Sequence, residues 1–312
     1  MPLVSVIVVS YGEKGYWQHC LEAVFRQTHK AVEVIFVDNS SGSSLSSEVQ
    51  AQYPQIRYYS ENKNLFYTGA LNKGISLSQG EFILCLNDDV IIDPDFIRQL
   101  AQSMEGDPAA GMASGKLLRP GGAVIDSAGL RLSIFRTAKE RGYNALNKGQ
   151  FNSREYIFGP SGAAAFFRKE ALEKIRTAGD YFDPDFRMFY EDLDIAWRLQ
   201  RSGWKCAYVP EAVAYHARGA SCRSQNGMNK RFARQYLSER LYWDLIKNRY
   251  LAMVKNETIP GFLVHLPFVI IYDLIAWLIL LLTRPALVAN VPSLIKLINS
   301  ALSRRKLVTV IG

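Results

Sequence analysis

Two adjacent carboxylates follow a strongly apolar stretch of this 312-residue chain. Residues 82–86 predict a buried strand, and Asn87, Asp88 and Asp89 come directly after it, ahead of another apolar triplet. Carboxylates held at such a strand end repel each other and resist desolvation unless a cation joins them. Mg2+ and Mn2+ prefer oxygen ligands of this kind. The tripeptide alone also fits a turn or a cap for the helix that Pro94 begins, so both interpretations stay open.

A second acidic cluster contains Glu191, Asp192 and Asp194 and follows the aromatic run 186–190. The apolar spacing after it predicts a helix with Glu191 and Asp192 in its first turn, where helix capping could account for one of the acids. Aromatic neighbours desolvate a carboxylate and raise its basicity, which indicates a general base. His216 follows an alternating apolar run. A lone histidine is usually a surface or satisfied residue, but as a third ligand it would tilt the cation site toward Mn2+.

The elements that must position these residues alternate between strand and helix. Apolar runs at 3–9, 32–37 and 82–86 predict buried strands, and residues 17–27 have helical spacing. This alternation predicts an α/β fold with an open, mostly parallel sheet flanked by helices. Ligands bind such sheets at the carboxyl ends of the strands. The side chains expected at that edge are Ser10, Asp38, Asn64 and the acidic triplet. No GxGxxG follows the first strand, and Asp38 taken alone could simply form an Asx turn.

The formal net charge of +8 is concentrated in the C-terminal third. Residues 217–256 carry nine basic and two acidic side chains, and residues 284–312 carry five basic side chains and no acid. A nucleic-acid binder could show such a patch. The apolar residues 261–282 beside it favour an anionic membrane surface instead, and no nucleic acid. The four cysteines form no CxxC pair and no secretory signal is evident, so we expect a reducing compartment.

The apolar C-terminal segment predicts membrane association without a simple crossing. Residues 261–282 could span a bilayer, but Asp273 would lie near its middle. Residues 285–303 have one apolar face, which is typical of a helix lying in the interface. We therefore expect a peripheral or monotopic protein on the cytoplasmic face of the cell membrane, with 217–256 and 284–306 facing anionic headgroups. The alternative is a helical subdomain packed on the catalytic body or on a second subunit of a homo-oligomer.

An ordered set of motifs covers roughly residues 3–250. The motifs are the segments 6–11, 37–40, 64–74, 86–90, 161–163, 189–194 with 203–204, 210–216 and 242–249. In this order they resemble the family 2 glycosyltransferases, the inverting enzymes of the nucleotide-sugar-binding GT-A fold. Within that family the chain is most similar to the rhamnosyltransferase-type members that build bacterial surface polysaccharides.

The resemblance implies a division of the chain into parts. Residues 1–216 would form the GT-A catalytic domain, with a nucleotide-sugar half at 1–108 and an acceptor half at 109–216, where the pattern from 109 to 154 is irregular. Residues 217–257 would form a basic helical extension. Residues 258–312 would form the hydrophobic and amphipathic membrane-associated helices.

The resemblance also implies a role for each matched residue. Asp192 would be the catalytic base and Glu191 would orient the acceptor, while Asp89 and His216 would hold Mn2+ or Mg2+. The residues implied at the nucleotide-sugar donor are Ser10, Tyr11, Asp38, Asn64, Asn72, Asn87 and Asp88. The chain departs from the family at two positions: Asn87 replaces the first Asp of the DxD motif, and Phe66 stands where the family often has Gly.

The implied function is the inverting, metal-dependent transfer of a single sugar, with dTDP-L-rhamnose as the favoured donor and UDP-sugars next. The acceptor would be a glycan or a lipid-linked saccharide. The Gln-x-x-Arg-Trp motif of processive synthases is absent at 200–204, which favours single transfer. Two other classes stay open, a non-catalytic membrane-attached scaffold and a nucleotidyltransferase. The latter would release pyrophosphate, although residues 10–15 make a poor phosphate loop.

Overall fold

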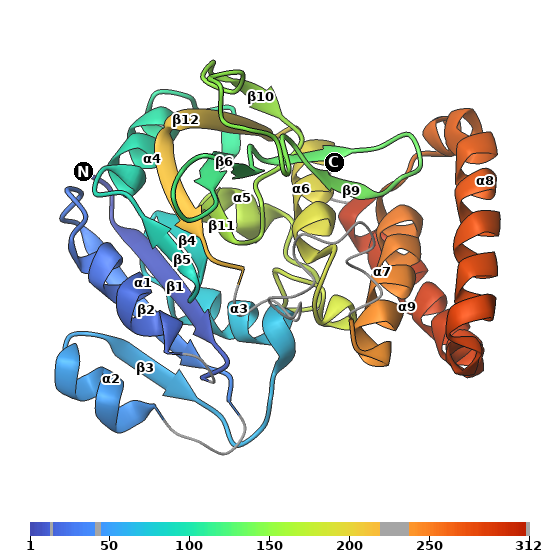
Figure 1. The fold of residues 1–312 in the computed structure, drawn as a ribbon, viewed down its shortest axis with the longest axis horizontal. Coiled ribbons are helices and arrows are strands. Elements are labelled where there is room, and N and C mark those ends of the chain that lie inside the picture. Colours follow the sequence, from blue (N-terminus) through green and yellow to red (C-terminus); the bar gives the residue numbers. More distant parts are fainter. Residues whose placement is uncertain (13–14, 41–44, 219–236, 310–312) are drawn as a thin grey trace.

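A ten-stranded sheet forms the body of the protein in the computed structural model, which describes residues 1–12, 15–40, 45–218 and 237–309. Helices cover both faces of the sheet, and the C-terminal helices stand to one side of it (Figure 1). The expected α/β architecture with a helix-flanked sheet is confirmed.

The first half of the sheet is parallel and contains β1 (Val4–Ser10), β2 (Val32–Asp38), β3 (Arg57–Ser60) and β4 (Phe82–Asn87), in the order β3-β2-β1-β4. Apolar residues on both faces of β1 are fully buried, as parallel strands covered by helices on both sides require. These strands match the ones that the apolar runs predict.

The second half of the sheet is mixed. Strand β11 (Ala164–Arg168) runs antiparallel between β4 and β6 (Ala110–Leu118), and β12 (Lys205–His216) runs parallel to β6. The remaining strands are β5 (Val90–Ile92) and β10 (Glu155–Ile157) on β12, β7 (Ile125–Ser127) on β6, and the hairpin β8 (Leu130–Leu132) with β9 (Ala138–Glu140). The irregular pattern expected from residue 109 onward was wrong for β6, where Ser114, Gly115 and Lys116 interrupt the apolar pattern of a fully buried strand.

Two apolar layers hold the helices to the sheet. On one face, α1 (Tyr16–Phe25), α2 (Ser46–Gln52) and α4 (Phe96–Glu105) share a buried cluster with the even-numbered valines of β1. The other face carries α3 (Phe66–Leu77), α5 (Lys169–Lys174) and α6 (Glu191–Arg201). Gly74 of α3 lies so close to β1 that a Cβ there would sit 2.3 Å from Ile7 Cγ2. This tight packing fixes α3 against the strands that carry the site.

The C-terminal helices are α7 (Glu239–Asn256), α8 (Ile259–Thr283) and α9 (Val291–Thr309), with the 3-10 turn η3 (Pro285–Asn290) before α9. A smaller apolar cluster packs α7 and α9 onto α6 and η1 (Pro184–Phe186); its buried members are Phe186, Tyr190, Leu193, Trp197, Leu251, Ala252 and Ala301. Within the described residues, two helical segments, Ile259–Thr283 and Pro285–Arg305, are long and apolar enough to cross a membrane. Only 11% of the most apolar window of the first is buried, unlike the core helix of a soluble protein.

Candidate functional site

The predicted edge of the sheet brings polar strand ends together. Ser10 lies beside Asp38 in the parallel register, and Val9 beside Asn87. The Ser10 hydroxyl donates a hydrogen bond of 2.6 Å to Asp88 Oδ2. Burial, more than the neighbouring charge of Asp89, raises the pKa of Asp88 to about 6. A buried, electronegative edge thus forms where the sequence predicts ligand binding.

Asp38 and Asn64, which are assigned to the donor, make local contacts of their own. Asp38 accepts from the backbone N–H of Ser40 at 3.0 Å, which is the Asx turn that the sequence allowed, and also from Leu45 N–H at 3.1 Å. Asn64 Oδ1 accepts from Phe66 N–H at 2.7 Å, where Phe66 has a positive φ of 57°. Tyr11 is exposed. The donor roles of these residues stay predictions.

The side chain of Asn72 is hydrogen-bonded to a neighbouring segment. Its Nδ2 donates to the Phe182 carbonyl at 2.7 Å, and its Oδ1 accepts from the N–H groups of Tyr181 and Phe182 at 3.1 and 2.8 Å. The carboxamide therefore holds residues 180–182 in place. A role for Asn72 at the donor stays a prediction, and through these contacts it would act by positioning that segment.

His216 meets the acidic pair because β12 pairs with β5, which places His216 opposite Val90. Its Nε2 lies 3.3 Å from Asp89 Oδ1, and its Nδ1 lies 2.8 Å from Asp126 Oδ2. Although burial alone lowers it, the hydrogen bonds to Asp126 and Asp89 raise the pKa of His216 to about 9. Arg218 donates to the other oxygen of Asp126. Asp126 thus orients the imidazole toward Asp89.

This pair fits a divalent cation in two respects. Ligand atoms at right angles around an octahedral ion with bonds of about 2.1 Å stand about 3 Å apart, close to the separation of His216 Nε2 and Asp89 Oδ1. A histidine that ligates a metal usually hydrogen-bonds a carboxylate through its other nitrogen, as His216 does with Asp126. The described residues contain no group of three or more His, Cys, Asp or Glu side chains that could hold a metal ion.

The candidate base lies at the start of α6. Asp192 Oδ1 accepts from Leu193 N–H at 2.8 Å, and Oδ2 accepts from Gly162 N–H at 3.2 Å. Burial raises the pKa of Asp192, while these two N–H groups favour its charged form. Burial and the charge of Asp192 raise the pKa of Glu191 as well, and within the described residues Glu191 Oε2 has no hydrogen-bond partner. The roles of Asp192 as base and of Glu191 in orienting the acceptor stay predictions.

Tyr67 connects the two acidic centres. Its hydroxyl lies 2.7 Å from Asn87 Oδ1 and 2.9 Å from the Gly162 carbonyl oxygen. Burial, and then the charges of Glu191, Asp192 and Asp89, raise the pKa of Tyr67. The edge of the sheet thus holds both the candidate base and the candidate metal ligands.

A second buried acid stands near this site. Glu140 of β9 accepts hydrogen bonds from Ser161 at 3.0 Å and from Ser127. Burial raises its pKa to about 7, against the lowering effect of Arg218. The sequence analysis missed Glu140, Asp126 and Arg218, because each comes from a segment without a recognisable local pattern.

A strained segment precedes Glu191. Arg187, Phe189 and Tyr190 all have positive φ, at 61°, 72° and 66°, which is unfavourable for side chains of this size. Asn248 of α7 is fully buried, and its Nδ2 lies 2.8, 2.8 and 2.7 Å from the carbonyl oxygens of residues 186, 188 and 189. Lys247 donates to the Asp185 carbonyl at 2.7 Å. The helix α7 therefore fixes the loop that delivers Glu191 and Asp192.

Asn248 is expected to be a positioning residue. Asn248→Ala should lower kcat while leaving the KM for the nucleotide sugar nearly unchanged. The variant removes the N–H groups that hold the loop before Glu191, but it does not alter the strand ends that are expected to bind the nucleotide sugar. The free energy of unfolding should fall by about 1–3 kcal/mol. Asn256→Ala is the matched control, since Asn256 is equally buried on α7 but donates to Asp194 at 2.8 Å and leaves the loop untouched. Equal loss of kcat in both variants at equal stability would contradict the assignment.

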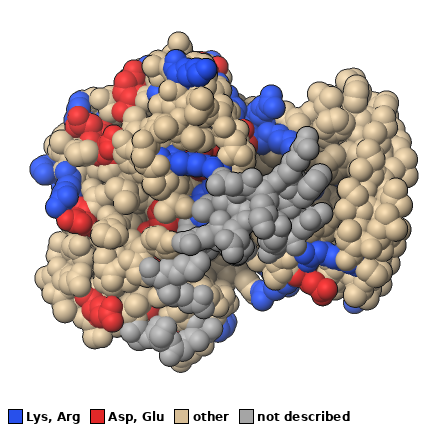
Figure 2. Space-filling view, viewed as in Figure 1, with Lys and Arg blue, Asp and Glu red and all other residues tan. Residues whose placement is uncertain are grey.

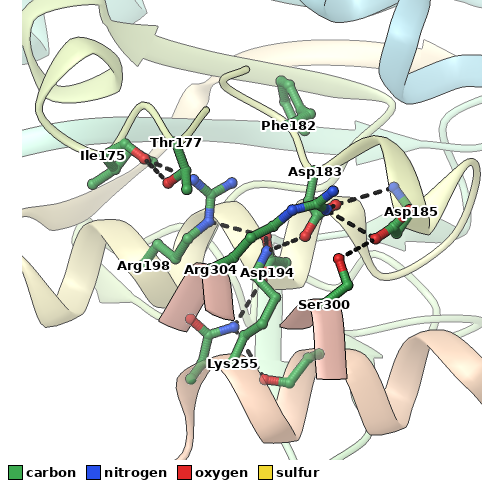
Figure 3. Close-up of polar contacts among 12 residues, drawn as sticks. Ile175, Thr177, Phe182, Asp183, Asp185, Asp194, Arg198, Lys255, Ser300 and Arg304 are labelled. Atoms are coloured by element: carbon green, nitrogen blue, oxygen red, sulfur yellow. Dashed lines mark hydrogen bonds and ion pairs between the residues drawn. The ribbon is translucent and has the colours of Figure 1, made fainter. Parts of the chain in front are cut away.

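Asp194, the third acid of the second cluster, belongs to a buried ion cluster (Figure 3). It pairs with Arg198 at 3.0 Å and with Lys255 at 2.8 Å, and Lys255 also pairs with Asp183 at 2.8 Å. Burial raises the pKa of Asp194, but Lys255 and Arg198 lower it below its usual value. Asp194 therefore ties α6 to α7, and its role is structural.

The same cluster receives the C-terminal helix. Arg304 of α9 pairs with Asp183 and, at 3.0 Å, with Asp185, and Arg305 donates to the Val254 carbonyl at 2.8 Å. The expectation that residues 284–306 face anionic headgroups was wrong for Arg304, because the carboxylates of Asp183 and Asp185 in the catalytic body pair with its guanidinium. The α9 helix is tied to η1, ahead of the strained segment.

Comparison with known proteins adds three findings. The model of glycosyl transferase family 2 matches residues 5–176. The N-acetylglucosaminyl-diphospho-decaprenol L-rhamnosyltransferase of Mycobacterium tuberculosis is 26% identical over 242 residues, which cover 70% of this chain and 77% of that protein. The poly-beta-1,6-N-acetyl-D-glucosamine synthase of Staphylococcus epidermidis is 22% identical over 68% of this chain, which spans about half (49%) of that relative.

Among solved structures, the crystal structure of GalNAc-T7 with UDP, GalNAc and Mn2+ is similar in fold, with a TM-score of 0.58. The match covers 84% of this chain and 53% of the solved chain, at 12% sequence identity. At that identity the likeness concerns the fold alone.

Proposed function

This chain belongs to glycosyl transferase family 2 and is a glycosyltransferase, and we propose that it transfers a single L-rhamnose from dTDP-L-rhamnose, with inversion, to a lipid-linked saccharide. The acceptor and the sugar are those in the name of the mycobacterial relative, and the staphylococcal relative is named for the synthesis of a glycan. The observation that carries the proposal is that Tyr67 contacts both Asn87, next to the acidic pair, and Gly162, whose N–H donates to Asp192.

The proposed reaction is one displacement. Asp192 takes the proton from an acceptor hydroxyl while the oxygen of that hydroxyl attacks the anomeric carbon of the donor sugar. The bond from the anomeric carbon to the phosphate oxygen of the donor breaks on the opposite face. The backbone N–H groups of Gly162 and Leu193 hold Asp192 in its charged form before the attack. Glu191, buried and kept protonated at neutral pH, donates to the acceptor and orients it. No covalent enzyme nucleophile is needed.

A divalent cation, Mn2+ or Mg2+, is part of the proposal. Asp89 and His216 would hold it, with Asp126 fixing the imidazole. When bound it would neutralise the charge that develops on the departing diphosphate. Ser10 and Asp88 would form the adjoining wall of the donor site.

Membrane attachment on the cytoplasmic side, through α8 and the residues around it, belongs to the same proposal. It is supported by the long, exposed, apolar α8 and by the lipid-linked acceptor in the name of the mycobacterial relative. An anionic membrane surface and a homo-oligomer stay predictions.

A panel of nucleotide sugars tests the donor directly. With Mn2+ present, dTDP-L-rhamnose should raise the melting temperature more than UDP-sugars do, because at equal concentration the ligand with the lower Kd stabilises the folded state more. A larger increase in melting temperature with a UDP-sugar would show that the UDP-sugar is the donor, and the proposed type of reaction would stay the same. Release of pyrophosphate instead of a nucleoside diphosphate would indicate a nucleotidyltransferase, and binding without turnover a scaffold.

The pH dependence of the reaction is expected to be shifted. Because burial raises the pKa of Asp192 above the ordinary value of 3.8, the base becomes protonated at a higher pH than a free aspartate does. The rate of transfer, measured as kcat/KM, should therefore fall on acidification with an apparent pKa above 3.8. A rate that stays constant down to pH 4 with a stable protein would contradict a buried base.

A further inference from the structure

Glu140 is an acid near the site that the proposed reaction does not use. It lies in β9 opposite Leu130 of β8, and the N–H of Leu130 donates at 2.7 Å to the Gly159 carbonyl on the other side. This pairing brings Glu140 beside the segment that leads into β11. Its Oε1 accepts from the Ser161 hydroxyl at 3.0 Å, and its Oε2 accepts from the Ser127 hydroxyl. The carboxylate therefore joins hydroxyl groups from two separate segments.

Ser161 begins the turn that supplies an N–H to the candidate base. Its carbonyl oxygen accepts from the Ala164 N–H at 3.2 Å, which closes the turn. The peptide group between Ser161 and Gly162 carries the N–H that donates to Asp192 Oδ2 at 3.2 Å. Within the described residues, Glu140 is the hydrogen-bond partner of the Ser161 hydroxyl. Glu140 thus holds the residue on which this peptide group begins.

The turn packs directly against the base. A Cβ on Gly162 would lie 3.2 Å from Asp192 Oδ2 and 3.3 Å from Asp192 Cβ. The Gly162 carbonyl accepts from the Tyr67 hydroxyl at 2.9 Å. The N–H that reaches Asp192 therefore lies between two points that side chains hold. Because its bond of 3.2 Å is at the long end of the usual range, a small displacement of Ser161 would break it.

The hairpin that carries Glu140 is fixed at its far end. Arg249 of α7 donates to the Phe135 carbonyl at 2.7 Å. The Phe135 ring packs on Phe268 and Tyr272 of α8, with ring centroids 6.4 and 5.9 Å apart. The α8 helix forms the broad surface almost without charged side chains in Figure 2. Glu140 therefore stands on an element held by its neighbours, as a residue that positions another must be.

From these contacts we infer that Glu140 is a positioning residue, which through Ser161 keeps the N–H of the next residue on the carboxylate of Asp192. This inference rests on the proposed function, since Asp192 is the base of that reaction. Glu140 itself takes no proton from the acceptor. Its effect on the rate comes from the place and the charge of Asp192.

Loss of this N–H should raise the pKa of Asp192. Burial raises that pKa, and the N–H groups of Leu193 and Gly162 lower it by favouring the charged form. The other titratable and charged groups around Asp192 and Glu140 are Glu191, Tyr67, Asp126 and Arg218. Burial raises the pKa of Glu140 to about 7, so its own charge contributes little below neutral pH.

Ser161→Ala tests the inference. It should lower kcat by about tenfold or more with the KM for the nucleotide sugar nearly unchanged, because a slightly displaced base loses much of its effect. The acidic limb of kcat/KM should move to higher pH. Glu140→Ala should give the same two changes, and the double variant should lose no more than either single variant. Glu140→Gln should lose much less than Glu140→Ala, because its amide oxygen can still accept from the Ser161 hydroxyl.

Ser127→Ala is the matched control. Ser127 is buried, as Ser161 is, and donates to the other oxygen of Glu140, but it is not next to Gly162. Its acidic limb should stay at the wild-type position. An equal movement of the limb in both serine variants would overturn the inference. A loss in Glu140→Gln as large as in Glu140→Ala would overturn it too, because the charge of Glu140 would then matter more than its hydrogen bond.

The outcomes separate this inference from the proposed function. Wild-type protein without transfer, or Asp192→Asn with near-normal turnover, overturns the proposed function. Wild-type transfer, an inactive Asp192→Asn and an unchanged kcat in Ser161→Ala together overturn the positioning role alone. If Glu140→Ala does not fold, Ser161→Ala and Glu140→Gln decide by the same measurements, since each keeps a side chain of similar size.

Discussion

Asp192→Asn is expected to reduce the rate of sugar transfer by about 10²–10⁴-fold while leaving donor binding nearly intact. The amide keeps the shape of the side chain, and its one oxygen can still accept from one of the two N–H groups, of Leu193 or of Gly162, that the carboxylate accepts from. It cannot accept the proton of the attacking hydroxyl. Donor affinity, measured by calorimetry in the presence of Mn2+, should stay within about a factor of a few of the wild-type value, since the strand ends are untouched.

Glu191→Gln is the matched control for that variant. Because burial keeps Glu191 protonated at neutral pH, an amide resembles its working form and the loss should be much smaller than for Asp192→Asn. Near-normal turnover of Asp192→Asn would remove this residue from the mechanism. A larger loss in Glu191→Gln than in Asp192→Asn would exchange the two roles.

Removal of the divalent cation is expected to abolish transfer. Excess EDTA should stop the reaction, and added Mn2+ or Mg2+ should restore it, because the proposed cation would neutralise the charge that develops on the departing diphosphate. Asp89→Ala and His216→Ala should each weaken metal-dependent donor binding, measured by Mn2+ titration. Asp126→Asn should weaken it less, by about 10–100-fold, since Asp126 orients His216 without being placed at the ion.

Two results would contradict the assignment of Asp89 and His216 as metal ligands. Full activity in excess EDTA, or donor binding that is unchanged in His216→Ala, would show that the pair is a structural ion pair. Asp194→Asn serves as the negative control for metal binding, because Asp194 lies in the separate ion cluster with Arg198 and Lys255. It should destabilise the protein without altering the metal dependence of the remaining activity.

Local sequence patterns predicted the parallel half of the sheet well. Continuous apolar runs such as 32–37 and 82–86 mark buried strands, and the polar residues after them must gather at one edge when the strands are parallel. Strand β6 was missed because Ser114, Gly115 and Lys116 break the apolar run although the strand is buried. Gly115 is there because a Cβ would lie 2.4 Å from the Ala212 carbonyl oxygen, a contact no local pattern reveals.

The candidate site shows the same limit. Asp89 and Asp192 could be predicted from the sequence because they follow apolar or aromatic runs. Asp126, Glu140 and Asn248 do not, because each acts through a partner that lies far away in the chain, such as His216 for Asp126. The inward orientation of Arg304 was equally hidden, since only the fold brings Asp183 and Asp185 beneath α9.

The most direct test of the whole account is to identify both products of one reaction. Purified protein would be incubated with Mn2+, dTDP-L-rhamnose and a lipid-linked saccharide, and the products analysed by NMR and mass spectrometry. The account predicts free dTDP and a single added sugar whose anomeric configuration is opposite to that of the donor. Retention of configuration would contradict the single displacement that Asp192 is placed to assist.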